Sequence, residues 1–155
     1  MRSILLLVLL SLAAGESFAG VDRFSADRCL FASFAGLLRG AHPNVEVAAF
    51  VVAADDGALS CLLWPRMAWV RSQTFTGRIP KGTVAIVHTH PPHEELPSAN
   101  DMAESRRIGL PFFVVTPTAV WAFDPSAGKN VRTTTAGDWI GAAMENCPRP
   151  HRSVR

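Results

Sequence analysis

The sequence lacks a strong charge of either sign, internal repeats and, beyond residue 19, any long hydrophobic run. Its 15 Lys and Arg face 13 Asp and Glu, and the formal net charge of +2 is too small to indicate a nucleic-acid partner. Because no apolar segment of membrane-spanning length follows residue 19, we expect the chain from residue 20 onward to be soluble, with no membrane span. The length of 155 residues suits one domain, and 48% apolar residues are ample for one core.

Cysteine is also scarce, since Cys29, Cys61 and Cys147 are the only three in the sequence. No two of them have metal-ligand spacing, and an odd number leaves at least one outside any intrachain disulfide. For Cys29 and Cys61, burial as core residues is as good an interpretation as a bond. Cys147 lies in a Pro-rich tail and is the most exposed candidate. The cysteines therefore indicate no metal site.

The N-terminus has the order of segments found in a secretory signal peptide. Met1-Arg2 precede an apolar run from Ile4 to Leu12, and the small-residue stretch Ser17-Phe18-Ala19 follows. The run is too short to span a bilayer as a mature helix, although a retained N-terminal anchor is the alternative. We expect a signal peptide at residues 1–19 and an exported protein, periplasmic or secreted.

Hydrophobic periodicity predicts alternating helices and strands in a single domain at residues 20–146, followed by a flexible tail at 147–155. The expected helices lie at residues 26–39, 100–108 and 138–146. The expected strands lie at residues 45–53, 58–64, 68–74, 83–87, 111–116 and 119–123. This order predicts a mixed α/β fold with one central mixed sheet and helices packed on it.

The residues that carry chemistry follow the strand expected at 83–87. His88 and His90 stand two positions apart on an extended segment, which directs both side chains to one side. A Pro-rich loop then leads to Asp101, at the start of a helix, where it can supply a carboxylate oxygen. Three such ligands and an open position for water are typical of a catalytic zinc site, whereas a structural site has four protein ligands. We therefore expect these three residues to bind Zn²⁺.

The complete pattern is H-x-H-x₇-S-x₂-D, in which the serine is Ser98. With the composition of this chain, chance would produce the pattern in roughly one sequence in two thousand. The alternative interpretation, a coincidental surface loop, is therefore much the weaker one.

This pattern resembles the JAMM signature of the JAB/MPN family of zinc metallopeptidases. The resemblance covers roughly residues 25–125, and the Pro-Ser-x-x-Asp step and the glycine before the next strand, Gly109, are typical of that family. It implies a JAB/MPN-like domain with cytidine-deaminase-like layering. It also implies that the chain is a metallopeptidase, which hydrolyses a peptide or isopeptide bond with a zinc-activated water.

The family also has a glutamate at the start of its first strand, and the matching residue is Glu46. This glutamate stands between Val45 and Val47 in an expected strand, where a charged residue needs a reason; a surface charge on an edge strand is the alternative. In the implied mechanism Glu46 takes a proton from the water and delivers it to the leaving amine. Zinc and the Ser98 hydroxyl would stabilise the oxyanion.

The loop residues His93, Glu94 and Glu95 are interpreted as solvated surface groups. Residues 101–111 leave no room for the long insertions with which larger relatives hold ubiquitin, and export would remove the chain from cytosolic modifiers. The expected partner is therefore a peptide or protein of the cell envelope. Two other functions stay open, a non-catalytic MPN-type interaction module and a zinc hydrolase of non-peptide amides.

Overall fold

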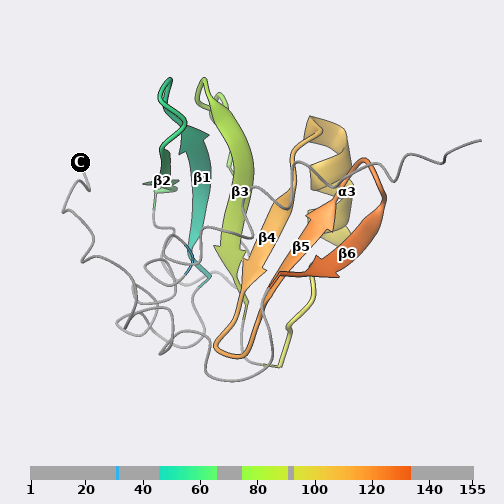
Figure 1. Ribbon diagram of the computed structural model, residues 1–155. Helices are drawn as coiled ribbons and strands as arrows, with labels where there is room; N and C mark the ends of the chain where they lie inside the picture. The colour runs from blue at the N-terminus through green and yellow to red at the C-terminus, as the bar shows by residue number, and fades with distance from the viewer. Residues whose placement is uncertain (1–30, 32–45, 66–74, 91–92, 134–155) are drawn as a thin grey trace, which may run out of the picture.

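One mixed β-sheet and a helix make up the part of the chain that the computed structural model describes, residues 31, 46–65, 75–90 and 93–133. The strands are β1 (Ala48–Ala53), β2 (Leu59–Leu63), β3 (Thr83–Thr89), β4 (Phe112–Val115), β5 (Val120–Asp124) and β6 (Lys129–Arg132), and the helix is α3 (Ala99–Ile108). The strands lie in the order β2-β1-β3-β4-β5-β6 (Figure 1). The predicted mixed α/β class with one mixed sheet is confirmed.

Several predicted segments lie outside the described residues. These are the signal peptide, the strand at 68–74, the helix at 138–146, the C-terminal tail and, apart from the helical Phe31, the helix at 26–39. Within the described ranges, no helix is long and apolar enough to cross a membrane.

The β1–β2 hairpin forms at the turn that the Asp-Asp-Gly sequence predicts. The backbone N–H of Ala54 donates to the carbonyl of Ala58 at 2.8 Å, and the Asp56 carboxylate accepts from the Ala58 N–H at 2.9 Å. Gly57 has a φ of 85°, a left-handed conformation that glycine adopts without strain. β1 then pairs with β3 on its other side, so the hairpin leads the chain into the centre of the sheet.

A crossover through α3 joins the only parallel pair in the described sheet, β3 and β4. Parallel neighbours need such a connection, and a helix is its usual form. The helix ends at Gly109, whose φ of 71° closes the last turn through a bond from its N–H to the Ser105 carbonyl. β3 is two residues longer than predicted, because His88 and Thr89 still pair with β4.

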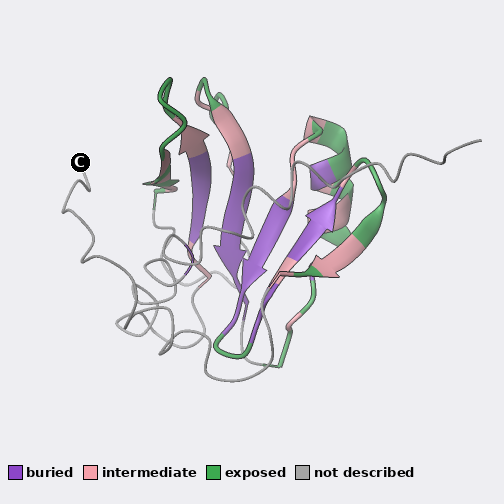
Figure 2. Cartoon of the chain, in the orientation of Figure 1, coloured by how far each residue is buried: buried purple, intermediate pink, exposed green. Residues whose placement is uncertain are grey.

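The two faces of the sheet follow from the alternation of side chains along each strand. One face carries a cluster of buried apolar side chains (Phe31, Ala49, Val51, Ala85, Val87, Phe113, Val115, Val120 and Ala122). A smaller cluster centred on Phe50, Ile86 and Phe112 lies on the other face, and Ile108 of α3 packs against it. His88 alternates with Val87, so it lies on this second face. The central strands are buried along most of their length (Figure 2).

Strand β6 was not among the expected elements. It pairs with β5 in antiparallel register, Asp124 with Lys129 through Trp121 with Arg132. Its sequence, Lys-Asn-Val-Arg, shows no apolar alternation, and its ends are exposed. Its formation depends on the tight turn after Asp124, which returns the chain along the open edge of β5.

Candidate metal centre

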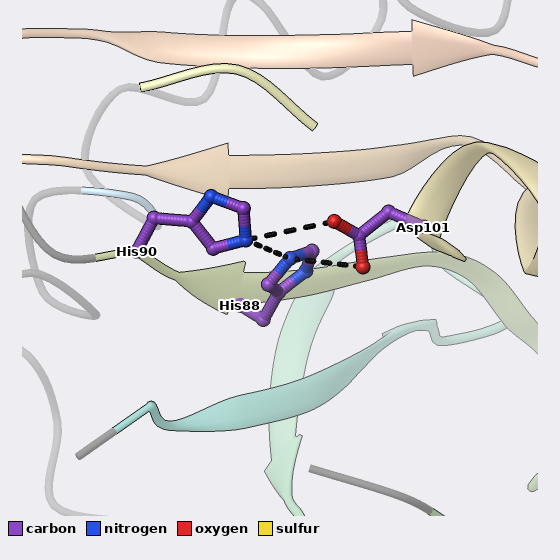
Figure 3. A group of neighbouring side chains, drawn as sticks. All are labelled: His88, His90 and Asp101. Atoms are coloured by element: carbon purple, nitrogen blue, oxygen red, sulfur yellow. Dashed lines mark hydrogen bonds and ion pairs between the residues drawn. The ribbon is translucent and has the colours of Figure 1, made fainter. Parts of the chain in front are cut away.

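The site lies where the carboxyl end of β3 meets the first turn of α3. His88 and His90 are almost fully buried, with 6% and 9% of their surface exposed. Their side chains turn toward Asp101, which projects from the helix (Figure 3). The structure therefore brings together the three residues predicted as zinc ligands, and one potential ligand atom from each lies within 4.8 Å of the others.

The separations between these atoms can be compared with those around a zinc ion. Nε2 of His88 lies 3.0 Å from Nε2 of His90 and 3.4 Å from Oδ1 of Asp101, and Nε2 of His90 lies 3.5 Å from Oδ2. Tetrahedral ligands at zinc bond lengths stand about 3.3 Å apart. Nitrogen and carboxylate donors are also the types that zinc prefers. The donor set therefore fits the metal in both chemistry and spacing.

The hydrogen bonds around the histidines favour the same interpretation. Nδ1 of His90 lies 2.9 Å from the carbonyl oxygen of Glu94, which can only accept, so Nδ1 carries a proton. In a neutral ring Nε2 then presents a lone pair toward Asp101. Groups that only accept, facing one another, need a cation between them, either a proton or a metal ion. The Glu94 carbonyl thus fixes the His90 tautomer that a metal requires.

Asp101 is held by a reciprocal cap at the start of α3. The Ser98 backbone N–H and hydroxyl donate to Oδ2 of Asp101 at 2.7 and 2.6 Å, and the Asp101 N–H donates to the Ser98 hydroxyl at 3.2 Å. This is the capping box, with aspartate in the place of the usual glutamate. Because Oδ2 takes both bonds from Ser98, Oδ1 is the oxygen better placed for a metal.

In the metal-free protein, Asp101 and His90 each stabilise the charged form of the other. Burial opposes ionisation of Asp101, but hydrogen bonds from His88 and His90 outweigh it and hold the pKa of Asp101 well below its usual range. Burial alone would lower the pKa of His90, whereas the Asp101 carboxylate raises it above the ordinary value. Asp101 is therefore ionised at neutral pH, as a metal ligand must be.

Glu46 approaches the site from the segment just before β1, two residues ahead of the strand, so it does not lie in the strand expected at residues 45–53. The β1–β3 register pairs Ala48 with His88, and continuing it past the end of β1 places Glu46 opposite His90. Directly opposite residues share a face of the sheet. Burial raises the pKa of Glu46, while the charges of His88 and His90 lower it, so this carboxylate is electrostatically coupled to both. The predicted base thus lies near the predicted ligands.

The loop between the ligands holds one contact that the sequence did not indicate. His93 and Glu94 are exposed as predicted, with 76% and 60% of their side chains accessible. Glu95 was interpreted as solvated too, but it is only partly exposed, and the Thr118 hydroxyl donates to its carboxylate. This bond joins the ligand-bearing loop to the β4–β5 turn. No sequence pattern marks such a bond between distant polar residues.

Comparison of the chain with protein-family models and with curated proteins finds no match. A functional assignment therefore depends on the motif and on the arrangement of its residues.

Proposed function

We propose that this protein is a zinc-dependent hydrolase of peptide or isopeptide bonds, of the JAB/MPN type. The observation that carries the proposal is the convergence of two imidazole nitrogens and one carboxylate within 4.8 Å; the two nitrogens lie 3.0 Å apart, and each lies 3.4 or 3.5 Å from one of the two carboxylate oxygens of Asp101. His88, His90 and Asp101 would hold the ion. Among the described residues, this group of three is where a metal could be held, and a fourth position would remain for water.

The order of elements supports the JAB/MPN-type layering. The signature histidines lie at the end of a central strand, the signature aspartate begins the crossover helix, and the glutamate precedes the adjacent antiparallel strand. This is the arrangement that the resemblance implies. This order of elements supports the proposal of JAB/MPN-like layering within the mixed α/β class.

In the proposed reaction, zinc held by His88, His90 and Asp101 would act as a Lewis acid, which would lower the pKa of a water molecule toward ~7 and polarise a carbonyl group. Glu46 accepts the proton of the attacking water and returns it to the leaving amine. Its half-buried position and its electrostatic coupling to His88 and His90 support this role. Ser98 orients Asp101, and its hydroxyl reaches a substrate oxygen only by exchanging its present bond to Oδ2.

The proposal extends to location and substrate. The sequence of residues 1–19 has the order of a secretory signal, so we propose an exported protein that acts on a peptide or protein of the cell envelope. The N-terminal sequence of the purified native protein tests this: a start at Gly20 supports export with removal of residues 1–19, and a retained Met1 contradicts cleavage at that site.

The experiment that tests the activity measures bound zinc and hydrolysis together. Purified protein is analysed for metal content and then incubated with a quenched fluorescent peptide library, with and without chelator. We expect about one zinc per chain and cleavage that the chelator abolishes. His88→Ala should lose the zinc, and Glu46→Gln should keep it while cleavage falls by roughly 10²- to 10⁴-fold.

His93→Ala is the matched control, because His93 lies in the same loop with its side chain exposed. It should keep both zinc and activity. Absence of zinc from the unaltered protein at neutral pH would refute the proposal. Zinc without peptide cleavage, but with cleavage of a non-peptide amide, would replace the substrate class and keep the metal centre.

A further inference from the structure

We propose that Thr89, the residue between the two histidines, is a positioning residue that holds Glu46 beside the metal ligands. This inference depends on the proposed function for its consequence in catalysis. Thr89 is 3% exposed, and it alternates with His88 and His90, so its side chain lies on the opposite face of β3. It therefore contacts neither a metal nor a substrate at the site.

Thr89 closes the last step of the ladder between β3 and the segment that carries Glu46. Its N–H donates to the Val47 carbonyl at 3.1 Å, as an antiparallel pair requires. The return bond is different, because the Val47 N–H donates to the Thr89 hydroxyl at 3.0 Å. A side chain thus accepts the bond that a backbone carbonyl usually accepts.

This bond from a backbone N–H to a side chain, in place of a backbone carbonyl, lies at Val47, the residue next to Glu46. β1 begins at Ala48, so Glu46 and Val47 lie beyond the regular strand and are tied to β3 by the two Thr89 bonds. If the hydroxyl is removed, the Val47 N–H loses its acceptor or must move to another. Without this bond the peptide that carries Glu46 is less firmly held relative to His90, and a displacement of about 1 Å can cost on the order of a hundredfold in rate.

The test compares Thr89→Val, which removes the hydroxyl at nearly constant volume, with Thr89→Ser, which retains it. Thr83→Val is the matched control, since Thr83 begins the same strand and its hydroxyl donates to Pro80 at 2.7 Å, away from the site. Zinc content, the hydrogen-exchange rate of the Val47 amide measured by NMR, and library cleavage are measured for each.

For Thr89→Val we expect about one zinc per chain, Val47 exchange faster by roughly fivefold or more, and kcat lower by about tenfold to a hundredfold with little change in KM. Thr89→Ser should restore the slow exchange and most of the rate. In a Glu46→Gln background, Thr89→Val should lower the residual rate no further, because both changes act through one carboxylate.

Equal Val47 exchange in Thr89→Val and the unaltered protein would overturn the positioning role, whatever the activity. An equal loss of rate in Thr83→Val would overturn it too, because the effect would then be general. Failure of the proposed function has a different signature. Zinc or chelator-sensitive cleavage would be missing from the unaltered protein, while the exchange experiment would still report on the Thr89 bond.

Discussion

On one face of β3, Ala85 and Val87 are fully buried among apolar side chains; on the other, His88 and His90 turn toward Asp101. The first face packs against residues such as Phe31 and Phe113, whose ring centroids lie 5.0 Å apart. The second face holds the ionisable side chains of the site. Burial is unfavourable for the charged forms of His90 and Asp101, and the interaction between the two side chains offsets that cost. A single strand thus supplies the stability of the fold and the groups of the site through alternate residues, and substitutions should be able to remove either without the other.

The largest effect on stability is expected on the core face. Phe113 is fully buried, and Phe113→Ala should lower the free energy of unfolding by about 3–5 kcal/mol, because it leaves a cavity among tightly packed neighbours. Urea denaturation of the metal-free protein measures this loss. Zinc content per folded chain should not change. A folded Phe113→Ala protein that cannot hold zinc would show that the two faces are not independent.

Zinc bound at the face of β3 that carries His88 and His90 should stabilise the protein. At a free zinc concentration near 100 times the dissociation constant, the free energy of unfolding should rise by about 2.7 kcal/mol, because the ion binds only the folded site. Thermal unfolding with and without zinc measures the increase. His88→Ala should abolish it, and Phe113→Ala should retain it. The same increase in His88→Ala would place the zinc elsewhere.

A smaller effect is expected at the helix cap. Ser98→Ala should cost roughly 1 kcal/mol of stability and about tenfold in zinc affinity, because Asp101 loses the bonds that orient it. Ser126→Ala is the control, since its hydroxyl donates to Asp124 at the same 2.6 Å, away from the site. Competition with a chromogenic chelator measures the affinities. Equal affinities in the two variants would contradict the orienting role.

The smallest effect is expected at Asp124, a buried carboxylate away from the site. Burial opposes ionisation of Asp124, but hydrogen bonds from Ser126 and Ala127 in its own turn outweigh it and lower its pKa. Its contribution to stability is therefore fully present above the usual pKa and is lost as the pH falls through the lowered value. Asp124→Asn should destabilise the protein at neutral pH. The difference from the unaltered protein should shrink below about pH 4, as acid titrations of unfolding can measure.

The features that the sequence predicted best are those that depend on neighbours in the chain. A short apolar run predicted β3, the Asp-Asp-Gly turn predicted the hairpin, and the i, i+2 spacing predicted that His88 and His90 share a face. Their role as zinc ligands stays a prediction, although the structure brings them to Asp101. Glu46 was selected by resemblance and by its apolar flanks, and its place opposite His90 depends on pairing between distant segments.

Other features could not be predicted because they depend on contacts between distant segments. β6 has no apolar alternation and forms because β5 offers an open edge. The bond between Thr118 and Glu95 joins two polar residues of ordinary surface character. In the sequence, Thr89 is one β-branched strand residue among several. Its special role becomes visible only when the Val47 N–H is seen to donate to its hydroxyl. In each case the structure depends on a residue that is distant in the sequence, and the pattern of neighbouring residues does not identify that residue.

The crossover through α3 has a consequence for the order in which the site can assemble. The three expected ligands lie in one short stretch from His88 to Asp101, so bringing them together closes only a small loop, which is entropically inexpensive and fast. Glu46 joins them only when β1 pairs with β3 across a much longer separation in sequence. If the proposed function holds, the folding chain binds zinc before Glu46 arrives, so the proposed activity begins only when the sheet is complete.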